Sequence, residues 1–194
     1  MVYVNAQRLE AALNALGEQL ALVGASAHLV VIGGSGLLAI GAVTRSTQDV
    51  DVVALAHHGR LVSAEPLPMP VVEAAALVAR DLDLDPTWLN PGPTSLLDLG
   101  LPDGFADRLG SRDYGRALRV SFASRLDQIH LKLYAAADRR APRDFADLRQ
   151  LAPTADELRA GARWARTHNM PGPFDDALAD ALAKFGVQDD GRDA

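Results

Sequence analysis

The stretch over residues 30–54, VVIGGSGLLAIGAVTRSTQDVDVVA, constrains the fold of this chain more than any other segment. It opens with an apolar run that ends at Ile32 and is rich in β-branched residues, which predicts a buried strand. Residues 33–36 are three glycines and a serine, so they predict a sharp turn whose backbone N–H groups can face an anion. Residues 37–43 can form one or two helical turns before a second strand begins.

That second strand carries two acids. Asp49 and Asp51 alternate with apolar residues, which predicts that both project from one face of the strand. Two carboxylates held that close repel each other unless a positive charge lies between them. A divalent metal with oxygen ligands, magnesium or manganese, is the expected partner. The pattern therefore predicts a metal site made by Asp49 and Asp51.

Apolar spacing predicts the elements on either side of this segment. Asn5 is expected to cap a first helix. The apolar stripe of that helix is predicted to consist of Leu9, Leu13, Leu16, Leu20 and Val23. A short helix is expected over residues 71–79, and a further strand over residues 116–122. The inward residues of the short helix are expected to be Val72, Ala75, Ala76 and Ala79.

After residue 124 the pattern predicts helices alone. Ser124 or Asp127 is expected to cap the first, which contains Lys132, and Pro142 to start the second. Thr154 is expected to cap a third helix. A break at residues 171–173 precedes a last amphipathic helix and a polar tail over residues 188–194, which is expected to be disordered.

Length and composition fit one domain. The 194 residues are 48% apolar, enough for a single core. We expect an α/β (α+β) fold, a small mixed β-sheet with flanking helices. Its core would span residues 1–152, with a C-terminal helical extension of the same domain over residues 153–194. The absence of cysteines, of a signal-peptide pattern and of any apolar run near ~18 residues predicts a cytoplasmic protein without a membrane span.

Other patterns lead to weaker hypotheses. Residues 34–39, GSGLLA, satisfy the dinucleotide-binding pattern G-x-G-x-x-G/A after a strand. That class of protein needs one acid at the end of its second strand and repeated strand–helix units, and neither is present. His57 and His58 are expected to form an exposed turn. The acids within residues 81–85 are expected to lie at a helix end, before a loop that Trp88 anchors.

The order of the main features resembles the nucleotidyltransferase signature, in which an apolar strand, Gly-Gly or Gly-Ser and an acid-x-acid strand follow one another. Residues 45–51, RSTQDVD, are similar to the R-x-T-x-D-x-D pattern of AbiEii or MenT-type nucleotidyltransferases. Lys132 and residues 143–148, RDFADL, resemble that family's helical lysine and its R-D-x-x-D-L segment. Residues 88–90, WLN, resemble a recurring piece of a branch described only as nucleotidyltransferase-like.

The resemblance implies an enzyme that moves a nucleoside monophosphate from an NTP, with Mg²⁺ or Mn²⁺ as cofactor. Asp49 and Asp51 would bind the metal. The implied catalytic residues are Asp49, Asp51, Lys132, Asp144 and Asp147. The implied nucleotide-binding residues are Gly33, Gly34, Ser35, Arg45, Thr47, Lys132 and Arg143. The implied setting is a bacterial toxin–antitoxin or phage-defence pair, with a cognate antitoxin as partner and a tRNA end or a protein hydroxyl as acceptor.

Two features keep alternatives open. Many nucleotidyltransferases carry a third carboxylate on a later strand, and residues 120–122 have none, so Asp144, Asp147 or, less readily, Asp127 would supply it. A catalytically silent nucleotide- or partner-binding module with the same fold is therefore a second hypothesis. Lys132 and the Arg143 segment also fit ordinary helix-surface charges. Despite the net charge of −6, a local concentration of arginines could track RNA: Arg108, Arg112, Arg116, Arg119, Arg125, Arg139, Arg140 and Arg143.

Overall fold

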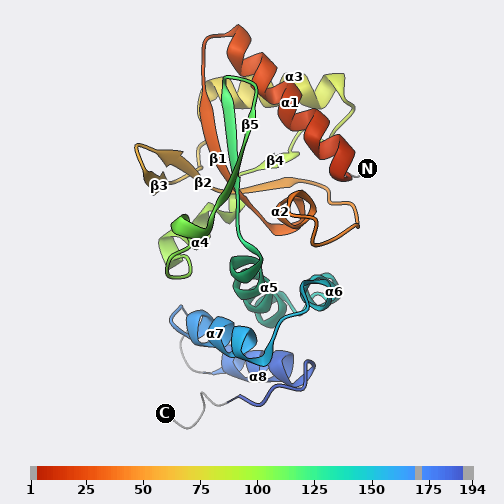
Figure 1. Cartoon of the computed structure of the whole chain (residues 1–194), viewed down its shortest axis with the longest axis vertical. Coiled ribbons are helices and arrows are strands. Elements are labelled where there is room, and N and C mark those ends of the chain that lie inside the picture. The colour runs from red at the N-terminus through yellow and green to blue at the C-terminus, as the bar shows by residue number, and fades with distance from the viewer. Residues whose placement is uncertain (1–3, 169–171, 190–194) are drawn as a thin grey trace. The chain divides into compact units, whose positions relative to one another are not determined.

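A mixed β-sheet forms the centre of the first of two compact units, Met1–Ser124 and Arg125–Ala194 (Figure 1). The computed structural model describes residues 4–168 and 172–189. The chain is mixed α/β, as the sequence predicts. The predicted boundary after residue 152 lies inside the second unit, between two of its helices.

Within the described residues, the sheet has six strands in the order β3-β2-β1-β6-β5, with β4 beside β2. β1 pairs in parallel with β6, and β2 with β4, whereas the β1–β2, β2–β3 and β5–β6 pairs are antiparallel. The strands are β1 (Ala27–Ile32), β2 (Val50–His57), β3 (Arg60–Val62), β4 (Leu89–Asn90), β5 (Gly110–Tyr114) and β6 (Leu118–Phe122).

The apolar strands are those that the sequence predicts. In β1, Leu29, Val30 and Val31 are fully buried, as expected for a near-continuous apolar run in the middle of a sheet. β6 confirms the strand expected within residues 116–122. His57 and His58 are both exposed, as predicted, but only His58 lies in the turn, because His57 is the last residue of β2.

α1 (Ala6–Leu22) begins at Asn5, whose side chain accepts a 2.9 Å hydrogen bond from the Arg8 N–H, so the predicted cap is confirmed. Its predicted stripe is buried except for Val23, which is 67% exposed because the helix ends one residue before it. Gly17 lies against β5, where an added Cβ would lie 2.2 Å from the Tyr114 carbonyl oxygen. This contact lets α1 approach the sheet closely.

α3 (Met69–Asp81) packs on α1 and is longer than the helix predicted over residues 71–79. The predicted inward face is wrong at Val72, which is 42% exposed, and at Ala76, which is also exposed. The residues that α3 buries are Val71, Ala74, Ala75, Val78 and Ala79. Trp88 follows in the loop after α3 and is fully buried, which confirms the predicted anchor.

The region between β4 and β5 contains short helical pieces separated by turns. They are the 3₁₀ turns η1 (Gly92–Thr94) and η2 (Ala106–Arg108) and the helix α4 (Ser95–Leu99).

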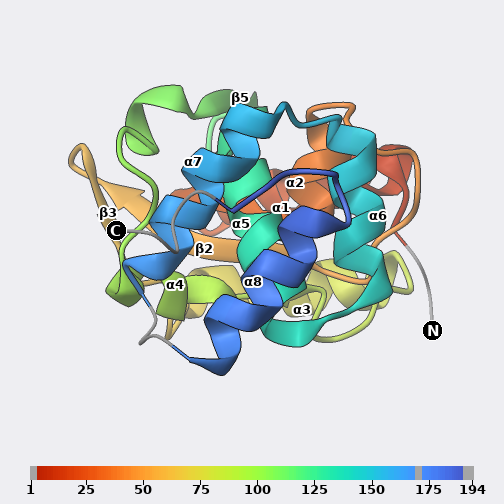
Figure 2. The same cartoon turned by 90° about the horizontal axis from the view of Figure 1, so that it is seen from below.

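The second unit is helical in its described part. Its helices are α5 (Arg125–Arg139), α6 (Pro142–Leu151), α7 (Ala155–Arg166) and α8 (Pro173–Ala183). α6, α7 and α8 all pack on α5 (Figure 2). Thr154 and Glu157 form a capping box at the start of α7, which confirms the predicted cap. Residues 169–171 and 190–194 lie outside the described residues, and with them parts of the predicted helix break and of the predicted tail.

Candidate functional site

The glycine-serine segment is the start of a helix. α2 (Gly33–Ala39) begins directly after β1, so the predicted turn over residues 33–36 and the predicted helix start at residue 37 are both wrong. Four residues of low helix propensity form the first turn because the buried end of β1 leads straight into it. Ser35 is fully buried, and its hydroxyl donates to the Ile32 carbonyl at 3.4 Å. The N–H groups of this first turn are the ones that a helix leaves without intrahelical partners.

Gly33 is in direct contact with Asp51. The residue has φ +67°, and a Cβ at this position would lie 2.2 Å from Asp51 Oδ2. The register of the sheet explains the contact, because Asp51 on β2 pairs with Ile32 at the end of β1. Only glycine combines this backbone conformation with this clearance. The second acid of the predicted pair and the first glycine of the predicted segment therefore meet at one point of the sheet.

Asn90 contacts Asp51 from the other side. β4 pairs in parallel with β2 so that Asp51 is opposite Asn90, and Asn90 Nδ2 donates to Asp51 Oδ1 at 3.0 Å. The Asn90 Oδ1 atom accepts the Gly92 N–H at 2.9 Å. Residues 88–90 resemble a recurring piece of the nucleotidyltransferase-like branch, but the sequence does not identify Asn90 as a site residue. The reason is that Asn90 and its partner Asp51 lie 39 positions apart in the chain.

Asp49 precedes β2 instead of lying within it, and it is partly exposed. The strand was predicted to include this residue, and the difference arises because ladder pairing begins at Val50. Thr47 is almost fully buried and exchanges two backbone hydrogen bonds with Val4, at 2.7 and 2.9 Å. Arg45 donates from Nη1 to the Ser46 carbonyl at 3.0 Å. These contacts fix the segment that leads into the acidic pair.

Three of the four predicted site residues of the second unit, Lys132, Asp144 and Asp147, form a buried ionic network. Lys132 Nζ lies 2.9 Å from Asp144 Oδ1 and 2.8 Å from Asp147 Oδ2, and Arg139 Nη2 lies 3.2 Å from Asp144 Oδ2. The exposed fractions of the three side chains that meet here are 9% for Lys132, 5% for Asp144 and 0% for Asp147. The alternative of surface charges is therefore wrong for these three, whereas it holds for Arg143, which is exposed.

The predicted site residues thus fall into two sets, one in each unit. The first unit holds the glycines, Ser35, Arg45, Thr47 and the acidic pair. The second holds Lys132, Arg143 and the two carboxylates of α6. That both sets act on the same nucleotide is implied by the resemblance and stays a prediction.

The acidic pair suits a metal ion that arrives with a substrate. In the described part of the chain, no three His, Cys, Asp or Glu side chains are grouped as metal ligands. β6 is the strand on which a third carboxylate would be expected, and residues 120–122 carry none. Its Ser121 hydroxyl lies 2.7 Å from both Ser111 Oγ and His28 Nε2. Mg²⁺ commonly takes one or two protein carboxylates and completes its octahedral shell with water and phosphate oxygens. Two hard carboxylates therefore fit Mg²⁺ bound together with a triphosphate.

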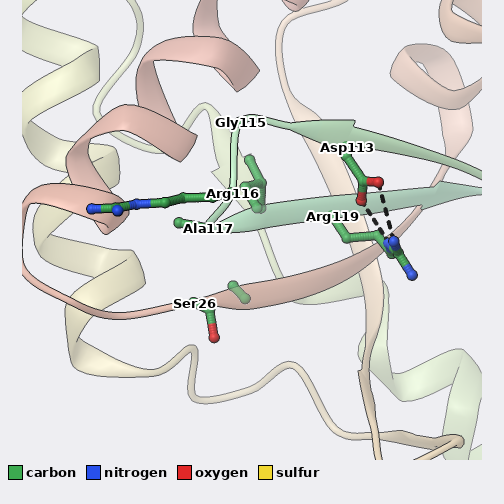
Figure 3. Close-up of a pocket in the computed structure, with 8 residues that line it drawn as sticks. Ser26, Asp113, Gly115, Arg116, Ala117 and Arg119 are labelled. Atoms are coloured by element: carbon green, nitrogen blue, oxygen red, sulfur yellow. Dashed lines mark hydrogen bonds and ion pairs between the residues drawn. The ribbon is translucent and has the colours of Figure 1, made fainter.

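A pocket of about 400 Å³ lies at the opposite end of β1 from Gly33 (Figure 3). It is lined by Ser26, by the start of β1 and by the turn between β5 and β6. In Figure 3, Asp113 and Arg119 face each other from neighbouring strands, with hydrogen bonds of 2.6 and 3.1 Å. The Arg119 guanidinium lowers the pKa of Asp113. This pocket contains none of the predicted catalytic, metal-binding or nucleotide-binding residues, although Arg116 and Arg119 belong to the predicted basic group.

At least four of the eight arginines of the predicted basic group form ion pairs with acids in the described part of the chain. The ion pairs are Arg112–Glu10, Arg119–Asp113, Arg125–Glu157 and Arg139–Asp144. Each pair cancels a charge that a phosphate backbone would otherwise attract. The structure therefore offers a weaker basic surface than the sequence suggests.

The apolar β1, the glycine-rich start of α2 and the acid-bearing β2 together define a nucleotidyltransferase-like core. The chain belongs to the family described as nucleotidyltransferase of unknown function (DUF6036), whose model matches residues 9–154. No curated protein and no solved structure matches the chain. Among the helices of the described residues, none has the length and apolarity that crossing a membrane requires.

Proposed function

We propose that the protein is a metal-dependent nucleotidyltransferase that moves a nucleoside monophosphate from an NTP to a hydroxyl of an RNA, such as tRNA, or of a protein. The observation that carries this proposal is the position of Asp51. Its carboxylate lies between Gly33, at the first turn of α2, and Asn90 on β4. An acid held beside backbone N–H groups is suited to bind a cation and a phosphate next to each other.

Nucleotidyl transfer is an in-line displacement at the α-phosphorus, so the protein mainly places groups and neutralises charge. Asp49 and Asp51 would hold Mg²⁺ or Mn²⁺, which supplies charge neutralisation at the phosphate oxygens. The backbone N–H groups of residues 33–35 would contact the phosphates. The acceptor oxygen bonds to the α-phosphorus, the bond to the β-phosphate oxygen breaks, and pyrophosphate leaves while the acceptor proton passes to solvent or a nearby base.

Lys132 and Arg143 are the proposed cationic contacts of the triphosphate from the second unit. The support for Lys132 is its buried ammonium, which already binds two carboxylate oxygens and has the chemistry to bind phosphate oxygens instead. Asp144 and Asp147 would then return to that ammonium after product release. Arg143 is exposed and can reach the nucleotide or the acceptor.

The proposed setting is a toxin–antitoxin or phage-defence pair, and it rests on the resemblance of residues 45–51 and 143–148 to AbiEii or MenT-type enzymes. A cognate antitoxin would be the protein partner. Because at least four of the eight arginines of the predicted basic group are paired with acids, we expect RNA binding that is weak and lost at moderate salt. Binding of tRNA that is undetectable even at low salt would favour a protein acceptor.

The test is incubation of the purified protein with each α-labelled NTP, magnesium, and either total cell RNA or a protein extract. We expect label in one of the two acceptor pools, dependent on the metal and absent from the Asp49→Asn/Asp51→Asn variant. A matched control is Asp103→Asn/Asp107→Asn, which removes two exposed acids from a loop of the same unit. Equal labelling by wild type and the Asp49→Asn/Asp51→Asn variant would overturn the proposal.

A second candidate is a catalytically silent module that binds a nucleotide or a protein partner. The observation in its favour is that the described residues group no third carboxylate with Asp49 and Asp51. Such a module would gain thermal stability from Mg²⁺ and an NTP but would label no acceptor with any of the four NTPs.

A further inference from the structure

The side-chain amide of Asn90 is held in one orientation by two hydrogen bonds. The Gly92 N–H is a donor, so the amide atom that it contacts at 2.9 Å must be the oxygen. The amide nitrogen therefore faces Asp51, whose Oδ1 accepts its hydrogen bond at 3.0 Å. Asn90 on β4 is thus a hydrogen-bond donor with a fixed orientation toward the Asp51 carboxylate.

The backbone that carries Asn90 is itself anchored. Trp88 is fully buried, and its indole N–H donates to the Ala75 carbonyl of α3 at 3.0 Å. The Trp88 carbonyl accepts the Val50 N–H at 2.5 Å, which aligns β4 with β2. A side chain on such a support keeps its position better than one on a free loop.

Both carboxylate oxygens of Asp51 therefore have a defined neighbour. Oδ1 accepts the Asn90 amide, and Oδ2 lies against Gly33. Outer partners that hold a carboxylate in place also orient it toward a bound cation, and loss of such partners commonly weakens metal sites.

We propose that Asn90 is a positioning residue that orients the Asp51 carboxylate for the metal–triphosphate complex. This inference rests on the proposed function, because it assigns Asn90 to the same site. It goes beyond the sequence, in which neither the acidic pair nor the glycine segment points to residue 90.

The proposed positioning role must be distinguished from a purely structural role of Asn90. The hydrogen bond from the Gly92 N–H to Asn90 also stabilises a local turn. Asn90→Asp makes the separation: a carboxylate still accepts the Gly92 N–H but cannot donate to Asp51. Asn14→Asp is the matched control, because Asn14 is exposed and donates only to the Glu10 carbonyl of its own helix, at 2.8 Å.

The first measurement is thermal unfolding in EDTA without nucleotide, so it does not depend on activity. We expect Asn90→Asp to lower Tm by at least about 2 °C, because two carboxylates then face each other, and to lower it hardly at all in an Asp51→Asn background. The same Tm change in both backgrounds would mean that the two side chains do not interact, and it would overturn the proposal whatever the protein binds.

The second measurement is Mn²⁺-dependent binding of each NTP. We expect Asn90→Asp to weaken it about 10–100-fold and Asn14→Asp to leave it unchanged. Unchanged binding by Asn90→Asp would reduce Asn90 to a turn residue and overturn the inference. If the Tm coupling is present but wild type binds no metal–NTP complex, the proposed function fails, and the orienting role fails with it.

Discussion

At the scale of single residues, the contact between Gly33 and Asp51 is the most restrictive feature of the site. The glycine has a left-handed backbone conformation and no room for a Cβ, because Asp51 Oδ2 occupies that space. Two separate costs would follow from any side chain here: backbone strain and displacement of the acid. Gly41 allows the two costs to be measured separately. It has φ +72° and nothing within 4 Å of an added Cβ, so a side chain there causes backbone strain alone.

We predict that Gly41→Ala lowers the free energy of unfolding by about 1–2 kcal/mol, the cost of a left-handed alanine. Gly33→Ala should cost on the order of 1–3 kcal/mol more, because Asp51 must move. Urea unfolding of both variants measures the difference. Equal losses for the two substitutions would show that Asp51 yields to the new Cβ without cost.

At the scale of elements, α5 and α6 are joined by an ion pair inside the second unit. From the sequence, Lys132→Ala is expected to change stability little, on the premise that a cleft-lining lysine need not join the core. The burial of Lys132 with Asp144 and Asp147 reverses that expectation. Removal of the Lys132 ammonium leaves Asp144 and Asp147 buried with less compensating charge, although Arg139 still pairs with Asp144, and such a loss is costly.

We predict that Lys132→Met lowers the free energy of unfolding by about 3–5 kcal/mol. Lys184→Met is the control, since Lys184 is exposed and lies over the Phe145 ring at 4.1 Å, a contact worth about 0.5–1 kcal/mol. Urea unfolding, followed by circular dichroism, gives both values. Partial recovery is expected when Asp144→Asn and Asp147→Asn are added. A loss for Lys132→Met as small as that of the control would show that the network does not stabilise the unit.

A further ion pair connects the start of α5 to α7. Arg125 forms a 2.6 Å ion pair with Glu157, and this guanidinium holds the pKa of Glu157 below its usual range. An acid with a lowered pKa in the folded state stabilises the fold above the unfolded value of about 4.3, and this contribution is lost as pH falls through the folded pKa.

We therefore predict that Glu157→Gln, which keeps an acceptor for the Thr154 N–H, is less stable than wild type at pH 7. The difference should shrink as the pH falls below about 4.3. Urea unfolding across this range gives the difference, and Asp156→Asn, at a side chain 95% exposed, is the control. A gap between wild type and Glu157→Gln that stays constant down to pH 3 would contradict the assignment.

The elements also show what an unaided sequence can predict. Apolar periodicity is sufficient for β1, β6, α1 and the helices of the second unit, because the residue types show which face is buried. β5 lacks that signal: four of its five residues are exposed, and its backbone pairing with β6 makes it a strand. The inward face predicted for α3 is wrong at Val72 and Ala76 and right at Ala75 and Ala79, because alanines and valines lie all round this helix. The start of α2 was misplaced because glycine usually ends a helix.

At the scale of the whole molecule, the candidate site was partly predictable. Asp51 and Gly33 could be named from their spacing along the chain. Asn90 could not, because its role depends on strand pairing across many residues. The burial of Lys132 could not be predicted either, since its partners lie on another helix and charged residues are usually exposed.

We predict that a magnesium–NTP complex at about 100 times its Kd raises Tm by roughly 5–10 °C, because it binds the folded state alone. Asp49→Asn/Asp51→Asn should abolish this gain while the secondary structure remains, and Asp103→Asn/Asp107→Asn should keep it. Differential scanning fluorimetry with and without EDTA makes the measurement. A full gain in the Asp49→Asn/Asp51→Asn variant would place the metal elsewhere.

The burial of Trp88 has an optical consequence. The chain has two tryptophans, Trp88 in the first unit and the half-buried Trp164 in the second. Trp164→Phe would leave one indole, shielded from water, two residues from Asn90. Its emission should be blue-shifted in the native protein and move to the red when β4 separates from β2. Fluorescence from that single variant would follow the opening of the strand beside Asp51 independently of the helical unit.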